Sequence, residues 1–115
     1  MTNIKYPFGK MEKIVLDGSA ALPETEIEKD TIIDIVDDGL SAARTLNLKL
    51  GDNVVPGTLL YLKAKADGGE RVLTIGTKIT DQNWTIASGK TEVCLFIFDA
   101  DADAFLPTGA KRQID

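Results

Sequence analysis

Residues 44–50 have the sequence RTLNLKL, in which three leucines alternate with polar residues. In an extended chain, successive side chains point to opposite sides, so Leu46, Leu48 and Leu50 would share one face. The residues between them would lie on the other face. This stretch therefore predicts a β-strand that buries one side and exposes the other.

Short runs of the same kind extend in both directions from this stretch and are separated by turn sequences. The predicted strands are residues 31–36, 44–50, 58–65, 71–75, 84–86, 91–98 and 104–106. The sequence Asp67-Gly68-Gly69 is the strongest hairpin signal, because glycine supplies the positive φ of tight turns. The pattern predicts an all-β fold, an antiparallel β-sandwich or jelly roll of about 7–8 short strands. Residues 31–43 stay open between strand and helix, since their apolar residues also have helical spacing.

The chain of 115 residues has room for one folded domain. Apolar residues are sparse and irregular in residues 1–30, which predicts an extended N-terminal arm with one short strand at 13–16. The alternative is that this region supplies the first strand of the main sheet and a loop. Residues 31–109 are predicted to form the β-sandwich, and the polar residues 110–115 a flexible tail.

The segment 93–98 (VCLFIF) is apolar on both faces of the predicted strand. One face of a sandwich strand ordinarily meets water, so this strand needs a second cover besides the core. We expect Val93, Leu95 and Ile97 to form a subunit contact in a homo-oligomer, because small β domains gain stability by assembly. The alternative is that the N-terminal arm folds back over them. Cys94, on the other face, is expected to be a buried apolar side chain.

The composition excludes several classes of function. The chain has 13 basic and 18 acidic residues, a net charge of -5, which argues against nucleic-acid binding. It has no histidine and one cysteine, which removes the usual general base and the common nucleophilic dyads and triads. We therefore expect no enzymatic activity and no cofactor. No secretory signal and no apolar run of about 20 residues is present, so we expect no membrane contact and synthesis in the cytoplasm.

Two weaker candidate sites remain. Asp99, Asp101 and Asp103 are spaced like the start of a calcium loop, but glycine and glutamate are missing at the later positions of that motif. They predict a solvated turn, with a weak cation site as the alternative and no true metal centre. Trp84 and Tyr61 are the aromatic residues that could form a sugar-stacking platform, although Trp84 is better explained as a core residue.

From Gly39 to Gly109, the order of segments resembles the small β-sandwich modules of tailed-phage structural proteins, namely head-fibre and capsid-decoration proteins. The resemblance is carried by residues 45–50 (TLNLKL), 57–64 (GTLLYLKA), 72–75 (VLTI), 86–91 (IASGKT) and 103–109 (DAFLPTG). The chain departs from these modules in having no shaft or coiled-coil region, which favours a compact knob over a long fibre.

This resemblance implies a non-enzymatic component of a phage or prophage virion that acts through protein–protein contacts. It implies a homo-oligomer, commonly a trimer, that is made in the bacterial cytoplasm and attached to the capsid protein by its N-terminal arm. The alternative function is a carbohydrate-binding module that uses Trp84 and Tyr61.

Overall fold

Strands make up the regular structure of the computed structural model, which describes residues 11–80 and 83–115 and has no helix within those ranges. The strands are β1 (Glu12–Val15), β2 (Thr25–Ile27), β3 (Thr31–Leu40), β4 (Arg44–Leu46), β5 (Leu48–Leu50), β6 (Leu59–Ala66), β7 (Arg71–Ile75), β8 (Trp84–Ile86), β9 (Thr91–Asp99), β10 (Ala104–Pro107) and β11 (Arg112–Gln113). The predicted all-β class is confirmed. The described residues form eleven strands, more than the predicted 7–8, because several are only two or three residues long.

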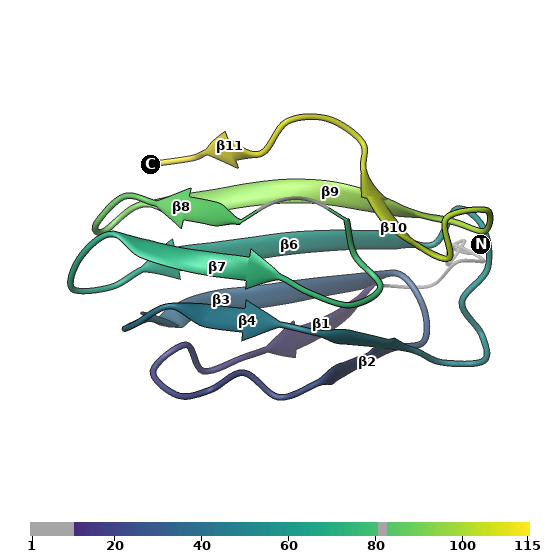
Figure 1. Ribbon diagram of the computed structural model, residues 1–115, viewed down its shortest axis with the longest axis horizontal. Coiled ribbons are helices and arrows are strands. Elements are labelled where there is room, and N and C mark those ends of the chain that lie inside the picture. The colour runs from purple at the N-terminus through teal and green to yellow at the C-terminus, as the bar shows by residue number, and fades with distance from the viewer. Residues whose placement is uncertain (1–10, 81–82) are drawn as a thin grey trace, which may run out of the picture.

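The larger of the two layers, which we call sheet A, has the strand order β1-β3-β6-β9-β10, with β11 also paired to β9 (Figure 1). β1 pairs with β3, and β3 with β6, in parallel, whereas β9 is antiparallel to β6, β10 and β11. The prediction of an antiparallel sandwich was therefore wrong in strand direction, since the sheet is mixed.

The second layer contains the pair β2-β5 and the strands β4-β7-β8. β4 and β5 follow each other with one residue, Asn47, between them. Leu46 and Leu48 both point into the core from these strands, as the alternation in residues 44–50 predicted, and Leu50 packs against its edge.

The parallel pairs arise because the chain passes between the layers. After β1 it forms β2 in the second layer and returns as β3; after β3 it forms β4 and β5 and returns as β6 (Figure 1).

Asp67-Gly68-Gly69 likewise leads from β6 in sheet A to β7 in the second layer, so the predicted hairpin is not formed. The glycines still adopt positive φ angles, of 76° and 159°. The turn was therefore predicted, but its partner strand was not.

The core lies between the two layers and joins them through aromatic contacts. Trp84 of β8 is fully buried and stacks on Phe96 of β9, with ring centroids 6.4 Å apart and planes at 12°. Phe98 and Phe105 meet edge to face at 5.5 Å near the turn between β9 and β10. Side chains of this size contribute most to apolar burial in a small domain.

The N-terminal region is part of the sandwich from residue 11 onward, not an arm. β1 pairs with β3 at one edge of sheet A, and β2 pairs with β5 in the second layer. Leu16 and Ile27 are core residues at 7% and 0% exposure. This corrects the prediction of an arm over residues 1–30 and agrees with the alternative, a strand of the main sheet. Residues 1–10 lie outside the described residues.

The structure settles the open alternative for one further segment and differs from the prediction for another. Residues 31–43, open between strand and helix, hold the ten-residue strand β3. Residues 110–115, expected to be a flexible tail, hold β11, which pairs with β9 at Val93 and Glu92. Asp115 accepts a hydrogen bond from the Thr91 amide at 2.7 Å, so the last residue is also attached to sheet A.

Candidate functional site

The outer face of sheet A, which points away from the core, carries two neighbouring rows of apolar side chains. Residues paired in register stand side by side on one face of a sheet, so the pairing defines each row. The rows, which we call the apolar rows, are Leu59, Ile97 and Leu106, and next to them Ile32, Tyr61 and Leu95. Leu95 and Ile97 are 37% and 38% exposed, and the other four are half-buried.

The structure separates the three residues predicted for an oligomer contact. Leu95 and Ile97 lie at the surface, whereas Val93 is 7% exposed because Lys63 and Arg112 flank it in register. β3 and β6 lie between β1 and β9 in sheet A, and β2 belongs to the second layer, so neither of these N-terminal strands covers β9. Any cover from residues 1–10 lies outside the described residues.

Charged side chains occupy the next row of the same face. Asp34, Lys63, Val93 and Arg112 stand in register across β3, β6, β9 and β11. Lys13 Nζ lies 3.5 Å from Asp34 Oδ2, and the other carboxylate oxygen of Asp34 is buried without a hydrogen-bond partner. Lys65 follows Lys63 on the same face of β6. The outer face is thus apolar at one end and mainly basic at the other, although the chain as a whole is acidic.

A hollow of about 290 Å³ lies where these two halves meet. It forms where residues 109–111 bulge away from β9, between Thr108, whose amide donates to the Leu95 carbonyl, and β11. Its lining includes the Tyr61 ring, the apolar side chains of Leu95 and Ile114, and the guanidinium-bearing side chain of Arg112. This combination suits an apolar group that carries a negative charge beside it.

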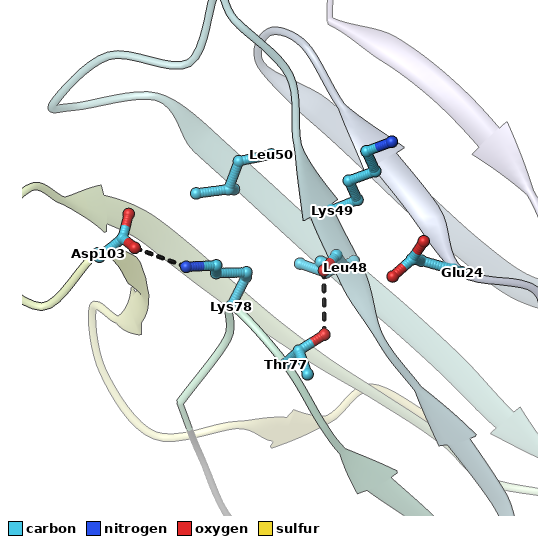
Figure 2. A pocket seen from close by; sticks show the side chains of 7 residues that line it. All are labelled: Glu24, Leu48, Lys49, Leu50, Thr77, Lys78 and Asp103. Atoms are coloured by element: carbon cyan, nitrogen blue, oxygen red, sulfur yellow. Dashed lines mark hydrogen bonds and ion pairs between the residues drawn. The ribbon is translucent and has the colours of Figure 1, made fainter.

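A second hollow, of about 490 Å³, lies on the other side of the molecule between β5 and residues 77–78 (Figure 2). Figure 2 shows Lys78 pointing toward Asp103, with which it forms an ion pair at 2.5 Å, and the Thr77 hydroxyl donating to the Leu48 carbonyl at 3.0 Å. Glu24 and Lys49 add one charge of each sign to the lining. This hollow therefore has no excess charge with which to select an ionic ligand.

The three aspartates of the turn between β9 and β10 do not converge. Asp99 accepts a hydrogen bond from the Ala102 amide at 2.8 Å, and Asp103 forms an ion pair with Lys78 of the neighbouring segment after β7. Within residues 11–80 and 83–115, no group of acidic, cysteine or histidine side chains gathers as a metal site would require. The structure therefore favours the solvated turn over the weak cation site.

The aromatic pair of the alternative function is also separated. Trp84 is fully buried against Phe96, and Tyr61 lies on the outer face of sheet A. Trp84 cannot stack on a sugar, so the predicted platform of Trp84 and Tyr61 does not exist. The preferred interpretation of Trp84 as a core residue is confirmed.

The one cysteine of the chain does not lie at the protein surface. Cys94 is buried, with its Sγ atom 3.7 Å from the Gly109 carbonyl oxygen, as expected for an apolar side chain. The pKa values of Asp17 and Asp115 are lowered, because hydrogen bonds from Ser19 and from Thr91, respectively, favour their ionised forms. Both carboxylates are exposed, and nearby positive charges also contribute to the lowered pKa values: Arg44 for Asp17, and Lys90 and Lys65 for Asp115.

No protein-family model, curated protein or solved structure matches this chain. In the described part of the chain there is no helix long and apolar enough to cross a bilayer.

The sequence analysis identified the apolar strand β9 but not most of the residues that lie beside it on the outer face of sheet A. Leu59 and Tyr61 alternate with core residues of β6, and this was the available signal that β6 extends the apolar surface. Ile32 and Leu106 carried no such signal, because their position beside β6 and β9 depends on pairing. The hollow depends on the bulge at residues 109–111, which no local sequence pattern predicts.

Proposed function

We propose that the protein is a non-enzymatic structural module that works through protein–protein contacts and associates with further copies of itself. The observation that supports this most directly is the pair of apolar rows. Their six side chains are neighbours and partly exposed, and contiguous apolar surface is costly to leave in water and is typical of interaction sites.

The narrower proposal is that the module belongs to the virion of a tailed phage or prophage, as a head-fibre or capsid-decoration protein. It rests on the resemblance of Gly39–Gly109 and on the suitability of the apolar rows for assembly. In this proposal the protein is made in the bacterial cytoplasm, forms a trimer, and contacts the capsid protein through its N-terminal region. Residues 11–30 of that region belong to the sandwich, and residues 1–10 lie outside the described residues.

Self-association is tested by light scattering over a wide range of protein concentration. The wild-type chain is expected to form a defined oligomer, and Leu95→Lys to be a monomer with an unchanged circular dichroism spectrum. Val72→Lys is the matched control, because Val72 is half-buried on a strand of the second layer, away from the apolar rows. A wild-type chain that stays monomeric at its highest soluble concentration would overturn the proposal.

The virion assignment has a separate test. Particles purified from the phage or induced lysogen that carries the gene are analysed by mass spectrometry. The protein should be present at a fixed ratio to the major capsid protein. Its absence from intact particles would remove the virion assignment and leave the proposal of a self-associating module standing.

A further inference from the structure

The exposed large apolar side chains are unevenly distributed over the described surface. They are Val15, Val55, Leu95, Ile97 and Ile114. Leu95 and Ile97 belong to the apolar rows, Ile114 lines the hollow beside them, and Val15 stands in register with Asp34. Val55 is the exception, because it lies beyond the end of sheet A.

Val55 lies at the same end of the molecule as the turn between β9 and β10, which we call the acidic turn because it carries Asp99, Asp101 and Asp103. The Gly57 amide donates to the Phe98 carbonyl at 3.1 Å, which ties the loop before β6 to the end of β9. Figure 1 shows residues 51–57 and 99–103 at one end of the sandwich. We call Val55 together with residues 99–103 the acidic end.

Within the acidic end, Asp101 is the carboxylate that remains for a partner. Asp99 is engaged with the Ala102 amide, and Asp103 with Lys78. Asp101 is exposed and forms no hydrogen bond or ion pair with the part of the chain that the structure describes. The acidic end therefore offers an exposed apolar side chain together with an exposed negative charge.

The hollow on the outer face of sheet A has the complementary chemistry. Tyr61, Leu95 and Ile114 form apolar walls, and Arg112 is the charged side chain of the lining. Lys63 stands in the same row as Arg112, on the other side of Val93. A basic surface on a chain of net charge -5 attracts the acidic regions of other copies.

We infer that the acidic end of one copy docks onto the hollow of the next. This inference rests on the proposed function and names the two surfaces through which copies associate. Because these are different regions of the chain, each copy can contact two neighbours, and the contact closes into a ring where its rotation allows. A ring of this kind is compatible with the proposed trimer.

Charge reversal tests the contact. Asp101→Lys and Arg112→Asp are each expected to raise the concentration for half-maximal assembly at least about tenfold, and the double variant to recover most of that loss. Val55→Ser should weaken assembly in the same direction. Assembly of the wild-type chain should also weaken as salt rises, because salt screens exposed charges.

Glu70→Lys is the matched control for Asp101→Lys. It makes the same change of charge at an exposed position in the turn after β6, at the other end of the sandwich, and should leave assembly unchanged. If Leu95→Lys abolishes assembly but Asp101→Lys has no more effect than Glu70→Lys, the acidic end is not the partner and the inference fails, while the proposed function stands. A wild-type monomer would overturn both.

Discussion

Trp84 and Phe96 come from different layers and stack with their ring planes only 12° apart, so one aromatic contact joins β8 to β9. Both side chains are fully buried. β8 has three residues and pairs with β7, and two of its side chains enter the core, Ile86 and the larger Trp84.

Replacing Trp84 by alanine is expected to lower the free energy of unfolding by about 3–5 kcal/mol, because it leaves a large cavity between the layers. Trp84→Phe should cost less, since it keeps an aromatic ring against Phe96. Urea denaturation followed by circular dichroism measures both variants. Equal stability of Trp84→Ala and wild type would mean that the two layers do not depend on this contact.

Gly76 lies where β7 ends, close against the neighbouring strand. A Cβ atom at this position would collide with the Asn47 side-chain oxygen and come within 3.0 Å of the Leu46 carbonyl. That Asn47 oxygen accepts the Thr77 amide at 3.0 Å, so Gly76→Ala should displace Asn47 and break this bond. We expect the free energy of unfolding to fall by about 1–3 kcal/mol, as measured by thermal or chemical denaturation.

Gly109→Ala is the control for Gly76→Ala. A Cβ atom there meets nothing within 4 Å, and Gly109 has no positive φ. The free energy of unfolding of Gly109→Ala should stay within about 0.5 kcal/mol of the wild-type value. A loss at Gly109 as large as that at Gly76 would contradict the assignment of the cost to close approach.

Asp30 caps the start of β6, because its Oδ1 atom accepts the Leu59 amide at 2.9 Å. Asp30→Ala removes this acceptor from a half-buried position and is expected to lower the free energy of unfolding by about 1–3 kcal/mol. Amide hydrogen exchange should accelerate at Leu59 more than at Leu62 in the middle of the strand. Unchanged protection at Leu59 would show that the carboxylate does not hold this end of β6.

Asp115 makes the attachment of the C-terminal segment sensitive to acid. The Thr91 amide donates to this carboxylate at 2.7 Å and the Thr91 hydroxyl at 3.2 Å, and these bonds lower its pKa. The stabilising contribution is complete above the unfolded-state pKa of about 3.9 and is lost as the pH falls through the lower folded-state value. The Thr91 amide shift in an NMR titration should report this change.

Asp115→Asn provides the comparison for that titration. The amide side chain does not ionise, so the acid transition of the Thr91 amide shift should disappear while the fold is retained. A wild-type shift that stays constant down to the onset of global unfolding would contradict a role for the Asp115 charge.

Local sequence patterns were sufficient to predict which side chains of a strand face the core and where the chain turns. Leu46 and Leu48 point inward as their alternation predicted, and β9 and β10 pair across the acidic turn. These features depend on side-chain period and turn residues over a few positions, which a single sequence contains.

The arrangement of the strands could not be obtained in the same way. Gly68 and Gly69 specify a sharp turn, but nothing local decides whether β7 pairs with β6 or crosses to the other layer. The parallel pairing of β1 with β3 and of β3 with β6 joins residues that are distant along the chain. The apolar rows and the hollow depend on that pairing, which is why only their β9 members were predicted.

The passage of the chain between layers also has a consequence for how the protein folds. β6 has β3 on one side, but its other neighbour, β9, comes later in the chain, after β7 and β8 of the second layer. During synthesis the Leu59–Ala66 edge therefore remains unpaired until β7, β8 and β9 have also left the ribosome. Non-local pairing of this kind slows folding and leaves strand edges open to aggregation. Lys63 and Lys65, on that strand, are charges of the sort that discourage such edges from joining prematurely.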